Sequence, residues 1–470
     1  MLRYAVIAGV LVVGCKRHDR PAVTQTTAVT GSAAGSAAAC PTGEREGELS
    51  WIRDDYAGAL ACAKSKHVPL VLDLWAPWCH TCLSMQTTVL NDTSFAPDAT
   101  KFVFASLDTD KDQNAQALTK LAISAWPTFY VIGDDETVMA RFVGGASLSQ
   151  FHAFLDAGAR AVIGGVAAAD AHLLSAERAL AVKDLATADT ELAATIAAAP
   201  VAWSRRPEVL GSLILTKQKR KDLAGCIDVA EQYMDVTGNA AVASDFLVSA
   251  TTCANDAAKA GTPDAAAVKH VRERAVARWK QLLADGDAPM SIDDRSDAMA
   301  SQRETMDALG DKAGAKQVAE AQAKLLDDAT AKAATPLVAM TYIWPRAEVY
   351  VYLGKPLDLV PALEKMALDL PKEYDPPARL GWLFWKANRL PEAANWTDQA
   401  LVLAYGPRKA RLLGMRADIA KAAGDLAAEK KFRQQAVDQY ESLPKGEDNP
   451  DGLAAAKAAL AALNGAGSAT

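Results

Sequence analysis

The chain has 470 residues, roughly two to three times the size of a usual single domain, so about three folding units are expected. Half of the residues are hydrophobic, 23% are charged and 6% are aromatic, and alanine dominates the C-terminal two-thirds, which favours packed helices over a disordered chain or a β-sandwich. The 50 Lys and Arg residues against 57 Asp and Glu residues give a net charge of −7. This balance provides no broad positive surface for a nucleic-acid backbone, so nucleic-acid binding is not expected.

Residues 1–15 have the pattern of a secretory signal. Arg3 precedes an apolar run that is too short to span a bilayer, and Gly14-Cys15 follows it. The segment resembles a bacterial lipoprotein signal, although leucine is commoner at the position of Val12. The resemblance implies a signal peptide over residues 1–15, a lipid anchor at Cys15 and a periplasm-facing location in the bacterial cell envelope, where disulfides persist. An ordinary cleaved signal that ends near a cysteine is the alternative.

Residues 16–47 are rich in Thr, Ser, Gly and Ala and show no apolar periodicity. Such a composition cannot bury enough apolar surface to order itself. We predict a flexible tether, which as a random coil would span roughly 30 Å on average.

Residues 48–163 alternate between predicted helices and strands. The pattern predicts a helix capped by Asp54 or Asp55 and running to Lys66, strands at 69–75 and 101–107, helices at 79–90 and 114–123, a hairpin of strands at 128–132 and 138–143, and a helix at 148–163. Alternation of the two element types predicts a sheet covered by helices.

The segment Trp78-Cys79-His80-Thr81-Cys82 follows the strand at 69–75 and opens the next helix. A cysteine at a helix N-terminus lies over free backbone N–H groups and the positive end of the helix dipole, which favours the thiolate. Cys79 is therefore the predicted nucleophile. Cys82 lies three residues later on the same helix face, where it can resolve a mixed disulfide on Cys79.

With these residues the segment resembles the thioredoxin family, over about a quarter of the chain. The resemblance implies an α/β thioredoxin-like domain with a central mixed sheet and flanking helices, no cofactor beyond the redox-active pair Cys79-Cys82, and as partners protein disulfide substrates and a thiol electron donor. It also implies that Asp73 is a buried carboxylate that exchanges a proton with the resolving cysteine, with a pKa raised by burial. Pro127, in Trp126-Pro127-Thr128, takes the place of the family's cis-proline loop, which holds the backbone of the partner.

Two departures from the family bear on redox direction. His80-Thr81 replaces the usual Gly-Pro, and Leu83 stands where many relatives have lysine. A protonated His80 would stabilise the Cys79 thiolate and make the protein more oxidising, whereas the alternative is an exposed His80 with no electrostatic role. The context of Asp73 and Trp78-Cys79 resembles that of reductants, so we predict reduction. No second C-x-x-C and no paired histidines complete a zinc site, so no metal is predicted.

Residues 164–470 show helix patterns behind recurring turn signals, at 183–186, 221–224, 354–356, 388–391 and 424–427. The clearest pair of segments begins at Leu390 and at Leu426, 36 residues apart. This spacing is close to the tetratricopeptide period, so the region resembles an all-α, tetratricopeptide-like helical repeat domain, which would bind a protein partner. A plain helical bundle is the alternative.

The remaining cysteines suggest structural disulfides. Cys226 and Cys253 lie on apolar faces of two predicted helices, 12 residues before and 15 residues after Gly238. In an antiparallel helix pair these distances place the two sulfurs at nearly the same level, so they can form a disulfide; two buried free thiols are the alternative. Cys40 and Cys62 are left over and are a weaker candidate pair.

Together these features predict a membrane-anchored periplasmic thiol–disulfide oxidoreductase that reduces protein disulfides while its helical repeats bind a partner or client. One alternative is a non-enzymatic anchored repeat scaffold for protein–protein interaction. Another is a disulfide oxidase or isomerase.

Overall fold

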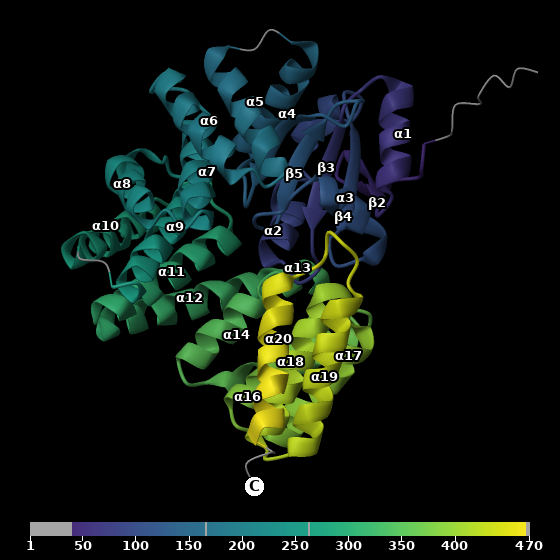
Figure 1. Cartoon of the computed structure of the whole chain (residues 1–470), viewed down its shortest axis with the longest axis vertical. Coiled ribbons are helices and arrows are strands. Elements are labelled where there is room, and N and C mark those ends of the chain that lie inside the picture. The colour runs from purple at the N-terminus through teal and green to yellow at the C-terminus, as the bar shows by residue number, and fades with distance from the viewer. Residues whose placement is uncertain (1–39, 165–166, 262–263, 467–470) are drawn as a thin grey trace, which may run out of the picture. The chain divides into compact units, whose positions relative to one another are not determined.

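The computed structural model describes residues 40–164, 167–261 and 264–466 (Figure 1). The predicted signal peptide, Cys15 and tether residues 16–39 lie outside the described residues. Within the described ranges, no helix combines the length and the apolar character that crossing a membrane requires.

The first half of the fold is built on a mixed sheet of six strands in the order β1-β2-β4-β3-β5-β6. The strands are β1 (Glu44–Glu46), β2 (Leu49–Arg53), β3 (Leu70–Trp75), β4 (Val103–Asp108), β5 (Thr128–Ile132) and β6 (Val138–Val143). β4 pairs in parallel with β2 and β3, whereas β1, β5 and β6 join antiparallel to their neighbours.

Four helices cover this sheet: α1 (Tyr56–Lys66), α2 (His80–Thr88), α3 (Ala115–Lys120) and α4 (Leu148–Ile163). Successive residues of β3 point to opposite faces of the sheet, so Leu70, Leu72 and Leu74 pack in one core and Val71 packs in the other. A strand buried on both faces needs apolar residues at nearly every position. The one charged residue of β3, Asp73, is therefore an exception that calls for a chemical reason.

The predicted fold class of this segment is confirmed, because every predicted strand and helix corresponds to an observed element. The sheet also includes two strands that were not predicted: β2, and β1 at residues 44–46, which were expected to belong to the tether. Residues 44–46 form the edge strand β1 by antiparallel pairing with β2, and the Cys40–Cys62 disulfide joins the chain just before β1 to α1. The sequence Glu-Arg-Glu carries no apolar alternation; backbone pairing with β2, ion pairs from Arg53 to Glu44 and Glu46, and the nearby crosslink hold it in place.

After α4 the described chain is entirely helical. Its α-helices are α5 (Ala168–Ala181), α6 (Leu185–Ala198), α7 (Arg206–Lys219), α8 (Leu223–Tyr233), α9 (Ala241–Lys259), α10 (Ala265–Ala284), α11 (Ile292–Leu309), α12 (Lys312–Lys332), α13 (Pro336–Met340), α14 (Ile343–Tyr352), α15 (Val360–Asp369), α16 (Asp375–Lys386), α17 (Leu390–Leu403), α18 (Gly406–Ala422), α19 (Leu426–Ser442) and α20 (Pro450–Ala466). Consecutive helices pack against one another, as in the pairs α5 and α6, α16 and α17, and α18 and α19.

The recurring turn signals have a common structural cause. Lys183 and Lys221 have positive φ angles of 62° and 61°, and each is followed by an aspartate that caps the next helix. The side chain of Asp184 accepts a hydrogen bond from the backbone of Thr187, and Asp222 does the same for Gly225. Such caps satisfy backbone N–H groups that a helix start leaves free. The repeated Lys-Asp-Leu-Ala segments are therefore helix ends followed at once by helix starts.

The 36-residue spacing also has a structural counterpart, because Leu390 and Leu426 are the first residues of α17 and α19. In the middle of the helical region, α8 and α9 are joined by a disulfide between Cys226 and Cys253, both fully buried in one hydrophobic cluster.

Candidate redox site

The loop between β3 and α2 carries the two cysteines of the C-x-x-C motif. Cys79 is the N-cap of α2, and its Sγ accepts a hydrogen bond of 3.1 Å from the backbone N–H of Cys82. The two sulfurs are joined in a disulfide. The first sulfur therefore lies at the positive end of the helix, where a thiolate is stabilised after reduction.

Aromatic side chains surround this disulfide. Cys79 and Cys82 are only 5% and 2% exposed, and they pack with Trp75, Trp78 and Trp126. The rings of Trp78 and Trp126 meet edge to face with 5.1 Å between their centroids. Hydrogen bonds fix both rings, since the indole N–H of Trp78 donates to Asp110 (2.7 Å) and that of Trp126 donates to Thr109 (2.8 Å).

Pro127 lies between this aromatic cluster and β5. The peptide bond between Trp126 and Pro127 is cis, as the resemblance to the thioredoxin family implies. The carbonyl of Pro127 accepts a hydrogen bond from Gly144, which ties the loop to the end of β6.

Asp73 lies in the middle of β3 and is 3% exposed. Its Oδ2 accepts a hydrogen bond of 3.2 Å from Ser106 on β4, and its Oδ1 has no hydrogen-bond partner among the described residues. Burial raises the pKa of Asp73 to about 7, even though the positive charge of Arg53 and the Ser106 hydrogen bond act in the opposite direction. A carboxyl group that titrates near neutral pH is suited to proton transfer.

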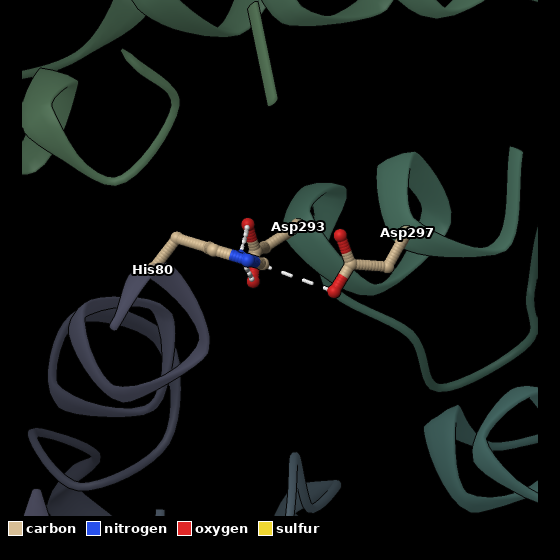
Figure 2. Close-up of side chains that lie close together, drawn as sticks. All are labelled: His80, Asp293 and Asp297. Atoms are coloured by element: carbon tan, nitrogen blue, oxygen red, sulfur yellow. Dashed lines mark hydrogen bonds and ion pairs between the residues drawn. The ribbon is translucent and has the colours of Figure 1, made fainter. Parts of the chain in front are cut away.

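His80, the residue after the first cysteine, makes a contact that the sequence did not predict. Its Nδ1 lies 2.9 Å and 3.0 Å from the two carboxylate oxygens of Asp293 and 3.9 Å from Oδ2 of Asp297 (Figure 2). Both aspartates belong to α11, four residues apart and hence on one helix face. The four-residue spacing could have shown that the two aspartates share a helix face. No sequence pattern, however, indicates that this face contacts His80.

The contact fixes the charge of His80. Burial lowers the pKa of its imidazole, but the carboxylates of Asp293 and Asp297 outweigh this effect and raise the pKa to about 10. His80 is therefore an imidazolium at neutral pH, and its ion pair with Asp293 differs from the alternative of an exposed histidine with no electrostatic role.

His80, Asp293 and Asp297 are also potential metal ligands, because their ligand atoms lie within 4.8 Å of one another. A protonated imidazole has no free lone pair, however, and a metal would have to displace the Nδ1 proton. The observed geometry is that of a hydrogen-bonded ion pair.

Later helices pack over the face of the domain that carries the disulfide. Leu83 of α2 packs with Met340 and Ile343, and the hydroxyl of Tyr405 donates a hydrogen bond to Asp108 at the end of β4. Arg408 and Arg411 of α18 each place a guanidinium 5.7 Å from the ring centre of Trp78. The helical region thus contributes directly to the surroundings of the cysteines.

A comparison with protein families agrees with the fold described for the N-terminal domain. Residues 55–157 match the family model "Thioredoxin". This match and the mixed sheet identify a thioredoxin-like domain, and such a domain supports a thiol–disulfide oxidoreductase type of function. Comparison with curated proteins gives no match.

Comparison with solved structures gives helical proteins. A tetratricopeptide repeat protein from Parabacteroides merdae is 12% identical over 63% of this chain and 99% of its own, with a TM-score of 0.41. The TPR2AB domain of yeast Sti1 in complex with pHSP90 is 11% identical over 63% of this chain and 98% of its own, with a TM-score of 0.23. BtubC from P. vanneervenii is 11% identical over 59% of this chain and 92% of its own, with a TM-score of 0.26. These TM-scores are too low to support an argument. The evidence for helical repeats is therefore the packing of consecutive helices and the recurring turn residues of this chain.

Proposed function

We propose that the protein is a thiol–disulfide oxidoreductase that reduces disulfides of client proteins, while helices α5–α20 hold a partner or client. The observation that carries the proposal is the Cys79–Cys82 disulfide with Cys79 at the N-cap of α2. The buried Asp73, with its pKa near 7, supports it.

In the proposed reaction the thiolate of Cys79 attacks one sulfur of a client disulfide, and the other client sulfur leaves as a thiolate. Cys82 then loses its proton, attacks the sulfur of Cys79 and displaces the client. The client gains two electrons and leaves as a dithiol, and Cys79 and Cys82 are left as a disulfide. An external thiol donor must reduce this disulfide before the next cycle. The bond changes in the protein involve only its two sulfurs, and Asp73 accepts the proton that Cys82 loses.

Replacing Cys82 by alanine tests the proposal, because it removes the resolving thiol. The variant should accumulate clients in mixed disulfides with Cys79, visible as adducts in non-reducing gels that disappear on reduction. A variant that also carries Cys79→Ser is the matched control and should trap nothing. Failure of Cys82→Ala to trap any protein would favour the alternative of an anchored, non-enzymatic scaffold.

Replacing Asp73 by asparagine should slow disulfide exchange by about tenfold or more, since the proton acceptor is removed while the shape is kept. It should also change how stability depends on pH. The folded protein holds this proton up to about pH 7, whereas the unfolded chain loses it near pH 3.8. Rising pH therefore weakens the folded state through that window, on the order of 4 kcal/mol in total.

Urea unfolding and exchange kinetics between pH 4 and 8 measure both effects of this variant. Asp73→Asn should lack the loss of stability above pH 4 that this carboxyl causes. If both pH profiles match those of the unmodified protein, Asp73 has no role in proton transfer.

A second direction of the same chemistry, oxidation of client dithiols, is favoured by the charge of His80. An imidazolium next to Cys79 stabilises the thiolate, and a stabilised reduced form makes the disulfide a stronger oxidant. Equilibration with glutathione buffers distinguishes the two directions, because a reductant has a potential near that of thioredoxin, about −270 mV, and an oxidant one nearer −120 mV.

The proposed setting is the periplasmic face of the bacterial envelope, with the chain held by lipid on Cys15. The pattern Val12-Val13-Gly14-Cys15 supports this, and the two disulfides Cys40–Cys62 and Cys226–Cys253 suit an oxidising compartment. Cys15→Ser should move the protein from the detergent phase to the aqueous phase in a phase-separation assay of expressing cells. Continued partition into detergent would contradict lipid anchoring.

A further inference from the structure

A cavity of about 390 Å³ lies beside the redox motif. The thioredoxin-like domain contributes Thr81, which stands between the two cysteines, Trp126 of the cis-proline loop and the pair Gly144-Gly145. Helices α7, α9 and α11 form most of the remaining wall, and α5 and α6 contribute Leu180 and Leu185. A volume in this range is typical of sites that take a ligand or a peptide side chain.

Three carboxylates line this cavity: Asp245 of α9 and Asp294 and Asp297 of α11. Two of them lie against the glycine pair. A Cβ atom added to Gly145 would come within 2.7 Å of Asp294 Oδ1 and 3.5 Å of a Thr81 methyl group, and one added to Gly144 would lie 3.0 Å from Asp245 Oδ2. These carboxyl groups therefore lie close to Thr81, which directly precedes Cys82.

These three carboxyl groups have few partners within the described residues. Asp245 has no hydrogen bond or ion pair there, and the carboxylate of Asp294 accepts only the backbone N–H of Ser291, at the start of α11. The nearest cation to Asp297 is His80 at 3.9 Å, which Asp293 already engages. Desolvation and the neighbouring carboxylates raise the pKa of Asp245 to about 7, that of Asp294 to about 6 and that of Asp297 to about 8. Without a bound cation these groups therefore share protons near neutral pH, and a bound cation would favour their ionised forms.

In the described part of the chain, no other charged residue of the wall forms an ion pair with these aspartates. Glu208 is paired with Arg205, outside the wall, and Arg141 is directed to Tyr130 and Ser124. Lys219 is exposed at the last turn of α7. A bound cation would relieve the repulsion among the three aspartates.

Apolar side chains complete the wall, namely Val143, Leu180, Leu185, Leu215, Val242 and Val248. A wall that combines apolar side chains with carboxyl groups matches a lysine or arginine side chain, whose methylene stem is apolar and whose head is cationic. A small inorganic cation would make no use of the apolar part.

We propose that this cavity binds a lysine or arginine side chain of the client next to its reactive cysteine, so that the protein selects disulfides in basic sequence contexts. The inference rests on the proposed function and names its substrate class. It assigns Asp245 and Asp297 as specificity-determining residues.

The test uses the full chain and three matched peptides that carry one cysteine in a mixed disulfide, flanked by arginine, glutamine or glutamate. Values of kcat/KM for their reduction should favour the arginine peptide over the glutamate peptide by about tenfold or more at low ionic strength, and salt should weaken the preference. The double variant Asp245→Asn/Asp297→Asn should reduce the preference to about twofold or less. Asp328→Asn, which removes one exposed carboxylate of α12 outside the cavity wall, should retain it.

Equal kcat/KM values for the three peptides would overturn the inference while leaving the proposed function intact. If no peptide were reduced and Cys82→Ala trapped no client, the proposed function itself would fail. All assays contain a chelator, and Zn²⁺ alone is titrated calorimetrically in its absence. Binding of Zn²⁺ that the double variant abolishes would assign the cavity to a metal ion and would also overturn the inference. Thermal unfolding of each variant shows that the chain is folded.

Discussion

Replacement of Cys79 by serine is expected to abolish thiol–disulfide exchange, whichever direction the electrons flow. Both half-reactions pass through a bond to the sulfur of Cys79, and a serine hydroxyl can neither form a thiolate nor make a mixed disulfide. The fall in rate should be about a thousandfold or more, because the covalent route is lost rather than weakened. Reduction of a peptide disulfide with dithiothreitol as the electron donor measures the rate.

The structure offers a matched control for this experiment. The pair Cys226→Ser and Cys253→Ser also removes sulfur from the chain, but in a hydrophobic cluster of α8 and α9 that contains no residue of the redox motif. This control should keep the exchange rate and lose part of its stability, about 3 kcal/mol for a loop of this length. Exchange that survived in Cys79→Ser would show that another group is the nucleophile.

Replacement of Gly406 by alanine is expected to uncover the redox disulfide. Gly406 begins α18 with a φ angle of 53°, and an added Cβ atom would lie 2.0 Å from the carbonyl oxygen of Asp110. An alanine is strained at this positive φ angle, and its Cβ would clash with a backbone oxygen that cannot rotate away. The start of α18 must therefore move. Its neighbours Tyr405 and Arg408 would then lose their contacts with Asp108 and Trp78.

The expected result is a rise of about tenfold or more in the rate at which dithiothreitol reduces Cys79–Cys82, together with a loss of stability of about 2 to 4 kcal/mol. Gly414→Ala is the matched control, since it lies on the same helix with no atom within 4 Å of the added Cβ. It should leave the reduction rate unchanged and, as an alanine within a helix, slightly raise stability. Equal reduction rates in the two variants would mean that α18 does not restrict access to the disulfide.

The sequence predicted those parts of the site that depend on residues close together in the chain. The buried strand β3, the C-x-x-C motif at a helix start and the Trp126-Pro127 loop each depend on residues within a few positions of one another. Strand β1 escaped prediction because its charged sequence has no apolar alternation and its order comes from pairing with β2.

The contacts of His80 could not be predicted for a different reason. Asp293 and Asp297 lie more than 200 positions further along the chain, on a helix whose sequence carries no mark of its partner. Only the packing of the helical region against the thioredoxin-like domain brings them together. The acidic wall of the cavity, which depends on the same packing, was likewise outside the reach of sequence patterns.

The covering of the disulfide by later helices has a consequence for the order in which the protein is made. The hydrogen bond between Tyr405 and Asp108 joins residues 297 positions apart. Ribosomes add roughly 5–20 residues per second, so α18 is synthesised roughly 15–60 s after the end of β4. A thioredoxin-like domain usually folds as a unit, well within such an interval. The nascent domain thus has its cysteines more open to thiol reagents and oxidants than the finished molecule does, because the helices that cover them do not yet exist.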